Sequence, residues 1–125
     1  MKEVIITKYG PPEVLQVREL ETPVPQNNQI LVRNHFTGIN FSEIMARMRL
    51  YPGAPKPPAT LGSEACGIVE SVGKDVTQFG PGDKVMLFCK FCSYSTHIIT
   101  SEEMVMPLPK DFSFEDGAAF PLVFV

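Results

Sequence analysis

Apolar and polar residues alternate along several short stretches of this chain, which is the pattern of half-buried β-strands. The alternation is clear over Gln29–Thr37, where Ile30 and Val32 are expected to face inward. Either His35 or Phe36 is expected to continue that inward face. The other segments predicted as strands are Val4–Tyr9, Val14–Leu20, Ala65–Val72, Lys84–Phe91, Tyr94–Ile99 and Met104–Met106.

Two segments have the apolar spacing and the capping residues of helices. The first is Phe41–Arg49, with Ser42 as its expected N-cap. Its predicted buried face consists of Ile44, Met45 and Met48. The second is a short helix that begins with Phe114–Ala119 and is capped by Ser113.

Twelve prolines and nine glycines divide the chain into short elements. Tyr51–Pro58 contains four prolines and is predicted to be an exposed loop, because proline fits neither a helix interior nor a central strand. Gly73–Asp83 is predicted to form a pair of turns. Many short strands with few helices indicate a mainly β fold with short helices, arranged as a small, partly open barrel.

Composition narrows the class of protein. A length of 125 residues suits one domain, and 44% hydrophobic residues suffice for a core. A net charge of −3 without a basic stripe argues against nucleic acid as a partner. No apolar run approaches the roughly 20 residues of a transmembrane helix. The charged start, Met1–Lys8, does not resemble a signal peptide, so a cytoplasmic location is expected.

The chain has three cysteines, an odd number that argues against a disulfide framework. Cys89 and Cys92 form a C-x-x-C pair inside a predicted strand. On a regular strand a spacing of three sends the two side chains to opposite faces. No second pair is present to complete a zinc site. Both cysteines are therefore expected to be small apolar strand residues without a redox or metal role.

Two motifs carry a resemblance to a known family. The first is Gly38-Ile-Asn-Phe-Ser-Glu43, within a segment that continues to Tyr51, and the second is Gly62-Ser-Glu64. They resemble the substrate-side signatures of the medium-chain dehydrogenase/reductase superfamily, G-[IV]-C-x-[TS]-D and G-H-E-x-x-G. Asn40 and Ser63 stand where the zinc alcohol dehydrogenases have their zinc-binding Cys and His. The resemblance therefore implies the zinc-free quinone oxidoreductase branch, and within it the vesicle-amine-transport-type proteins.

The resemblance covers nearly the whole chain and implies that residues 1–125 form a GroES-like catalytic domain. Members of the family bind their cofactor in a second, Rossmann domain, whose glycine-rich turn lies between a strand and a helix. Gly80-Pro-Gly82 precedes a strand instead, so it is predicted to be a corner. The chain is therefore expected to be the N-terminal part of a longer protein and inactive alone. NADPH would be bound mainly by the absent domain, through which the parent would form a homodimer, while the isolated barrel would be a monomer.

The resemblance also implies the candidate site. Asn40 would face the nicotinamide, although an asparagine there could instead cap the following helix. Tyr51 would bind substrate through its hydroxyl or would anchor the proline-rich loop. Ser63 would contact the cofactor or support a turn. Glu64 would either pair with a basic group or act as a catalytic acid. Arg49 stands where relatives have glycine, so a left-handed turn, and with it the family geometry of Tyr51, is expected to be disfavoured.

The function implied is metal-free hydride transfer from NADPH to a quinone or another electron-poor alkene. Asn40 and Tyr51 are the expected catalytic residues, and Asn40, Ser63 and Tyr51 the expected cofactor contacts. His35 and His97 lie on predicted strands and are expected to be structural or exposed. The alternative is a non-enzymatic interaction module, as the vesicle-associated relatives suggest. A co-chaperonin is disfavoured, because the chain has no evident mobile hydrophobic loop.

Overall fold

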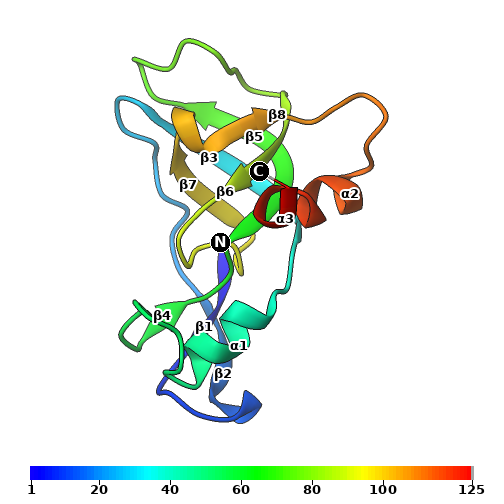
Figure 1. The fold of residues 1–125 in the computed structure, drawn as a ribbon. Coiled ribbons are helices and arrows are strands. Elements are labelled where there is room, and N and C mark those ends of the chain that lie inside the picture. Colours follow the sequence, from blue (N-terminus) through cyan, green and yellow to red (C-terminus); the bar gives the residue numbers. More distant parts are fainter. Residues whose placement is uncertain (125) are drawn as a thin grey trace.

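Two antiparallel sheets carry the fold in the computed structural model, which describes residues 1–124 (Figure 1). The larger sheet has the order β7-β3-β5-β6-β8 and the smaller one the order β2-β1-β4. The larger sheet comprises β3 (Gln29–Thr37), β5 (Glu64–Val72), β6 (Lys84–Phe88), β7 (His97–Ser101) and β8 (Val105–Pro107). The smaller sheet comprises β1 (Lys2–Ile6), β2 (Leu15–Glu19) and β4 (Ala59–Thr60).

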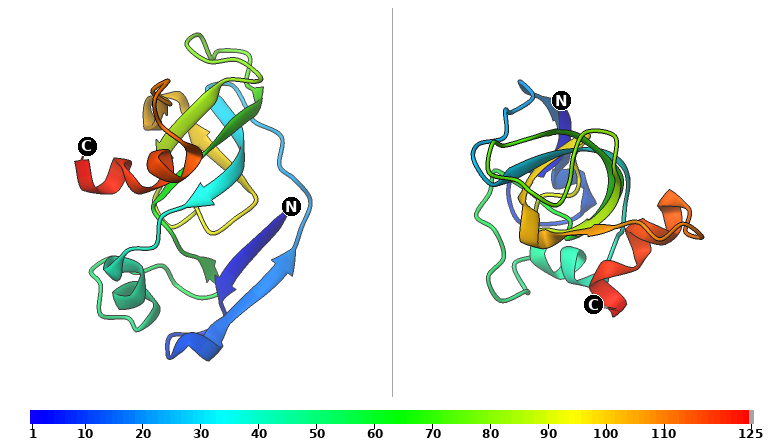
Figure 2. Two further views of the ribbon diagram at one scale, coloured as in Figure 1. Left: turned by 90° about the vertical axis from the view of Figure 1, so that its right-hand side faces the viewer. Right: turned by 90° about the horizontal axis from the view of Figure 1, so that it is seen from above.

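Helices are few and short. The three α-helices are α1 (Phe41–Arg47), α2 (Phe114–Ala119) and α3 (Pro121–Phe124), and 3₁₀ turns span Pro12–Val14 and Glu102–Met104. Helix α1 lies beside the smaller sheet at one end of the molecule, whereas α2 and α3 lie against the larger sheet (Figures 1 and 2). Among the helices of residues 1–124, none has the length and apolar character needed to cross a membrane.

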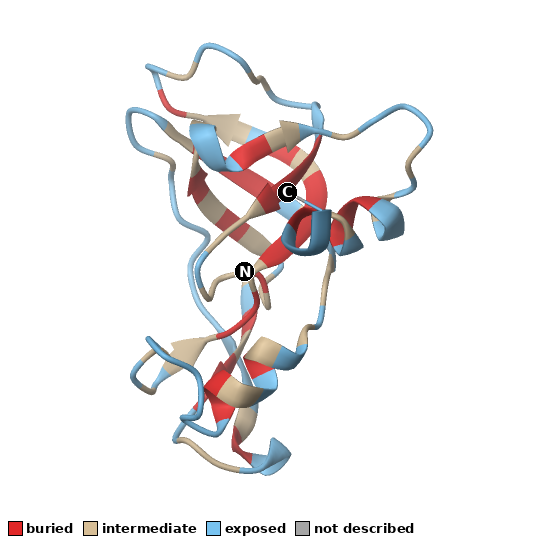
Figure 3. Cartoon of the chain, in the orientation of Figure 1, coloured by how far each residue is buried: buried red, intermediate tan, exposed pale blue. Residues whose placement is uncertain are grey.

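The larger sheet curls around its own core, as the view from above in Figure 2 shows. Alternate strand residues point inward, and they appear as buried segments along the sheet in Figure 3. This core consists of Ile30, Val32, Ala65, Val69, Val85, Leu87, Ile98 and Val105. The mainly β, partly open barrel predicted from the sequence is therefore confirmed, and so is the inward orientation of Ile30 and Val32.

The apolar core residues of β3 end at Val32. The pairing of β3 with β5 shifts register between Leu31 and Val32 and again between Asn34 and Phe36. Such bulges change the direction in which the following side chains point. His35 is exposed and stacks on Phe114, with ring centroids 4.6 Å apart, and Phe36 is 42% exposed. The prediction that one of these two side chains faces inward is wrong.

The buried face of α1 also differs from the prediction. Ile44 is 38% exposed and Met48 is 42% exposed, while Glu43, Ala46 and Arg47 are buried. Polar partners make this orientation possible, since Arg47 Nη1 donates a hydrogen bond of 2.6 Å to the Gly10 carbonyl and the Glu43 carboxylate accepts one from the backbone N–H of Asn40. A second core lies between α1 and the smaller sheet and consists of Ile6, Val14, Ala46 and Leu61.

Both ends of the first predicted helix need correction. Asn40 is the N-cap instead of Ser42, and its backbone has the extended conformation typical of that position. The helix ends at Arg47, two residues before the predicted end, because Arg49 adopts a left-handed conformation with a φ of 61°. The second predicted helix is confirmed, since Ser113 Oγ accepts a hydrogen bond from the backbone N–H of Asp116 at the start of α2.

The prediction for Cys89 and Cys92 is wrong. Strand β6 ends at Phe88, so neither cysteine lies on a regular strand. The chain turns at Phe91, which has a φ of 57°, and the two sulfur atoms form a disulfide. The argument from opposite strand faces failed because the turn brings residues three apart onto the same side.

Candidate functional site

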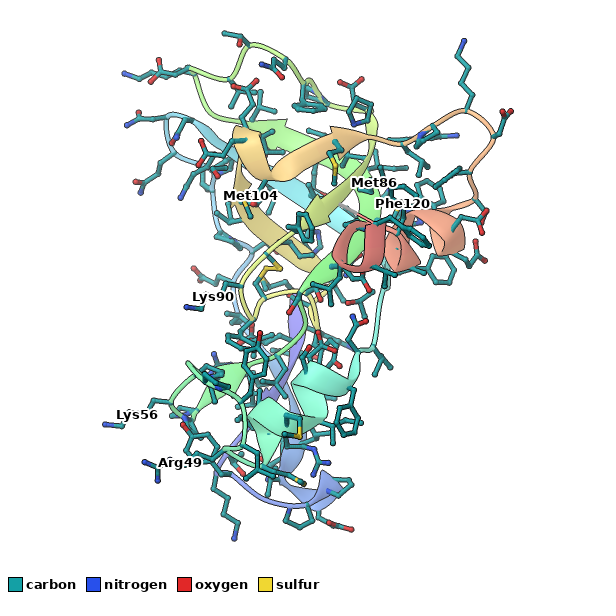
Figure 4. The ribbon with its side chains drawn as sticks, viewed as in Figure 1. Arg49, Lys56, Met86, Lys90, Met104 and Phe120 are labelled. Atoms are coloured by element: carbon teal, nitrogen blue, oxygen red, sulfur yellow. A yellow bond between two sulfur atoms is a disulfide. The ribbon has the colours of Figure 1, made fainter. Side chains whose placement is uncertain are left out.

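Tyr51 and Ser63 line the same depression, about 320 Å³ in volume, between the end of β6 and the region of α1. The lining consists of Ser42, Tyr51, Ser63, Phe88, Cys89, Lys90, Phe91, Met104 and Leu122. Lys90 and Met104 mark its position in Figure 4. Aromatic and aliphatic side chains thus form most of the wall, and the Tyr51 and Ser63 hydroxyls are among its few polar groups. This combination suits a small, partly apolar ligand.

Asn40 lies outside the lining of this depression. Its side-chain amide donates a hydrogen bond of 2.8 Å to Glu64 Oε1, and its backbone begins α1. Because Glu64 directly follows Ser63, this bond connects Asn40 to the wall of the depression. The structure therefore brings Ser63 and Tyr51 together and places Asn40 one hydrogen bond away, in the bracing position at the helix start.

Glu64 is the residue on which these elements converge. Its side chain is almost completely buried, and both carboxylate oxygens are used. Oε1 accepts the bond from Asn40, and Oε2 accepts a bond of 2.8 Å from the backbone N–H of Leu122 in α3. The carboxylate thereby joins the start of α1, strand β5 and α3. A Cβ on Gly38 would overlap the Glu64 side chain, so this position has room only for glycine.

Tyr51 follows a turn that the sequence did not predict. Arg49 adopts the left-handed conformation despite its side chain, and its backbone N–H bonds to the Ala46 carbonyl at 3.1 Å. The expectation that arginine would prevent this turn is wrong. The Tyr51 ring is 41% exposed and meets the Phe91 ring edge-on, with centroids 6.2 Å apart. Phe91 thus packs against the tyrosine within the same depression.

Tyr94 and Glu43 form a polar pair beside the site that sequence reasoning did not identify. The Tyr94 hydroxyl donates a hydrogen bond of 3.4 Å to Glu43 Oε2. Burial raises the pKa of Tyr94, and the charge of Glu43 together with this hydrogen bond raises it further. Tyr94 is therefore a protonated donor at neutral pH. Glu43 belongs to the first family motif, but only the structure shows that it meets Tyr94, 51 positions away.

Neither histidine lines the depression. His35 stacks on Phe114, and His97 Nε2 lies 3.5 Å from Glu70 Oε1. Both histidines therefore make contacts outside the depression. This agrees with the prediction that they are structural or exposed.

The donor atoms near the site do not resemble a zinc centre. Within residues 1–124, no group of three or more His, Cys, Asp or Glu side chains is arranged to hold a metal ion. Asn40 and Ser63 offer amide and hydroxyl groups, whereas zinc in proteins prefers thiolate and imidazole ligands. The hydroxyls of Ser63 and Tyr51 can hydrogen-bond a polar group of a ligand while the apolar wall packs against its ring.

Comparisons with known proteins agree with this architecture. Residues 26–112 match the alcohol dehydrogenase GroES-like domain. The chain is 35% identical to the quinone oxidoreductase of Mus musculus over 121 residues, which is 95% of this chain and 37% of that protein.

Solved structures agree as well. The human synaptic vesicle membrane protein VAT-1 homolog-like protein superimposes with a TM-score of 0.95 at 33% identity, over 99% of this chain and 40% of that one. The Escherichia coli quinone oxidoreductase complexed with NADPH superimposes with a TM-score of 0.89 at 37% identity, over 96% of this chain and 37% of that one. The chain thus spans well under half the length of the relatives it matches.

Proposed function

Because this chain belongs to the alcohol dehydrogenase GroES-like domain family, we propose that it forms the substrate-side domain of an NADPH-dependent, zinc-independent oxidoreductase. The substrate class is a quinone or another electron-poor alkene. The relatives are more than twice as long as this chain, so we place the nucleotide-binding domain in a further part of the same protein. The neighbour from E. coli, which was crystallised with NADPH, supports the choice of cofactor.

One observation carries this proposal. Ser63 and Tyr51 share one depression, and Asn40 is fixed beside it by Glu64. Asn40 and Ser63 stand where zinc-dependent relatives have metal ligands. The site therefore keeps the family framework but offers hydrogen-bonding groups in place of a Lewis acid.

The side chains have distinct roles in this account. The Tyr51 hydroxyl donates a hydrogen bond to a substrate carbonyl oxygen, and Ser63 and Asn40 contact the cofactor. Phe88, Phe91 and Leu122 exclude water, which strengthens each of these hydrogen bonds. NADPH, when bound, supplies the hydride. Burial and the Glu43 charge keep Tyr94 protonated, so its hydroxyl remains a hydrogen-bond donor to Glu43.

A second candidate function rests on the likeness to the VAT-1 homolog-like protein, which is at least as close in structure as the likeness to the quinone oxidoreductases. The domain would then be a non-enzymatic interaction module. The two candidates differ in one property, because only the enzyme turns over NADPH with a small substrate.

Steady-state kinetics on the complete protein tests the assignment of residues. Tyr51→Phe should lower kcat/KM on the order of 100-fold, the loss typical of one donor to a developing oxyanion. Tyr9→Phe is the matched control, since the Tyr9 hydroxyl bonds to the Pro55 carbonyl and does not line the depression. Equal losses in both variants would remove Tyr51 from the mechanism. Absence of any NADPH oxidation in the unmodified protein would instead favour the interaction module.

We also propose that the complete protein is a cytoplasmic homodimer that associates through the further domain, so that residues 1–125 alone are monomeric. Sedimentation of both forms tests this. A dimer formed by the 125-residue chain would place the contact in this domain instead.

A further inference from the structure

The disulfide between Cys89 and Cys92 closes a loop in the wall of the depression. The loop is held by backbone hydrogen bonds to Gly62 and Ser63, the two residues directly before β5. The Cys89 N–H donates to the Ser63 carbonyl, and the Cys92 N–H donates to the Gly62 carbonyl, each at 2.9 Å. A change in the backbone conformation of the loop would therefore alter the backbone position of Ser63.

The same loop holds the aromatic partner of Tyr51. Phe91 lies between the two cysteines in sequence and has a φ of 57°, a conformation that is strained for a non-glycine residue. Its ring meets Tyr51 edge-on. Such a conformation persists only where the surrounding structure enforces it. Here the disulfide and the two backbone hydrogen bonds enforce it.

The three cysteines differ in their chemical access. Cys66 is fully buried, and burial raises the pKa of its thiol to about 12, so it is inert at neutral pH. Cys89 and Cys92 are both partly exposed, and the exposed Lys90 lies between them in sequence. Partial exposure gives a small thiol in solution access to this pair, which the buried Cys66 lacks.

We propose that Cys89 and Cys92 form a reversible thiol–disulfide site that exchanges with a low-molecular-weight thiol of the glutathione type, and that its redox state sets the position of Phe91 against Tyr51. In the forward direction, the thiolate of the small thiol attacks one sulfur of the pair. This forms a mixed disulfide and releases the other cysteine as a thiolate. A second small thiol then displaces the first protein sulfur. Two thiols are oxidised to one small disulfide, and the protein pair gains two electrons and two protons.

This site is independent of the proposed enzymatic function, because it needs neither NADPH nor a quinone. Reduction removes the covalent closure of the loop, so Phe91 can leave its left-handed conformation. Tyr51 then loses the ring that packs against it. The ratio of reduced to oxidised thiol in the surroundings therefore changes the shape of the depression through this pair.

Alkylation of the folded chain in glutathione buffers of graded reduced-to-oxidised ratio tests the exchange. We expect no alkylated cysteine in oxidising buffer and two, Cys89 and Cys92, in reducing buffer, with unchanged far-UV circular dichroism. Cys66→Ala is the matched control and should give the same transition. Cys89→Ser should abolish the two-thiol transition: Cys92 alone should be a free, alkylatable thiol in reducing buffer and a mixed disulfide with glutathione in oxidising buffer. Two free thiols even in the oxidising buffer, or a pair that is reduced only on unfolding, would overturn the proposal.

Nuclear magnetic resonance of the tyrosine rings tests the connection to the depression. Tyr51→Phe assigns the Tyr51 ring signals among the three tyrosines. Reduction should shift these signals, since the Phe91 ring current changes. In Phe91→Leu the Tyr51 signals should respond much less to reduction. Tyr51 signals that stay in place while both thiols become free would refute control of Phe91 by the pair.

Discussion

The side-chain amide of Asn40 donates a hydrogen bond of 2.8 Å to Oε1 of Glu64, and this bond connects the N-cap residue of α1 to strand β5. The carboxylate is almost completely buried, and its other oxygen accepts from the Leu122 N–H. A buried carboxylate is tolerated only when its lone pairs are satisfied. The two donors therefore keep Glu64 in place, and Glu64 in turn orients the asparagine.

Glu64→Gln is expected to destabilise the fold. A glutamine offers one acceptor and one amino group, so either Asn40 or Leu122 loses its acceptor and meets a second donor. The loss should be about 1–3 kcal/mol, the cost of one unsatisfied buried donor. Urea denaturation measures the free energy of unfolding. Glu103→Gln, at an exposed position, is the control and should change this free energy by no more than about 0.5 kcal/mol. Equal effects at both positions would contradict the proposed role of Glu64.

Gly38→Ala is expected to displace the same carboxylate. The added methyl group would overlap the Glu64 side chain, and overpacking of this kind costs about 1–3 kcal/mol. Gly80→Ala is the matched control, because a methyl group there meets no atom within 4 Å. A thermal shift should separate the two variants. A Gly38→Ala protein as stable as Gly80→Ala would show that Glu64 moves aside without cost.

Arg49→Gly is expected to be more stable than Arg49→Ala by about 1 kcal/mol, because only glycine adopts a φ of 61° without steric strain. Both variants remove the guanidinium group that lies 5.5 Å from the centre of the Tyr9 ring, so their difference isolates the backbone effect. Denaturant midpoints measure it. The opposite order would mean that the loop before Tyr51 relaxes once the side chain is shortened.

Cys66 is expected to weaken the fold at alkaline pH. Its folded pKa of about 12 lies above the ordinary value of 9.0, chiefly because of burial. The folded state therefore holds this proton more tightly than the unfolded state. The resulting stability is complete below pH 9 and is lost at about 1.4 kcal/mol per pH unit as the pH rises from 9 towards 12.

Unfolding free energies of the parent and of Cys66→Ala, measured between pH 8 and 11, test this sign. The advantage of the parent should shrink above pH 9. Both proteins should carry Cys89→Ser and Cys92→Ser, so that the Cys66 thiolate cannot exchange with the disulfide after unfolding. An advantage that is constant or grows with pH would contradict the buried, protonated thiol.

Much of the sheet could be predicted because a strand buries every second residue, as Ile30 and Val32 show. The buried face of α1 could not be predicted, because Glu43 and Arg47 are buried with hydrogen-bond partners in distant segments. The spacing of apolar residues does not reveal such partners. The disulfide was not predicted because the turn at Phe91 needs a residue in the left-handed conformation, and the sequence has no glycine there to indicate such a turn. At the site, the family motifs indicated Ser63 and Tyr51. The role of Glu64 depends on Leu122, 58 positions away, and became visible only when the chain was folded.

The central claim is that Asn40, Ser63 and Tyr51 belong to a zinc-independent, NADPH-dependent reductase. Its most direct test is the oxidation of NADPH by a small quinone, catalysed by the complete protein after dialysis against a chelator and with its zinc content measured. We expect quinone-dependent oxidation without zinc, at a rate that added zinc does not raise. NADPH binding without turnover across a panel of quinones and enones, or activity that follows stoichiometric zinc, would contradict the claim.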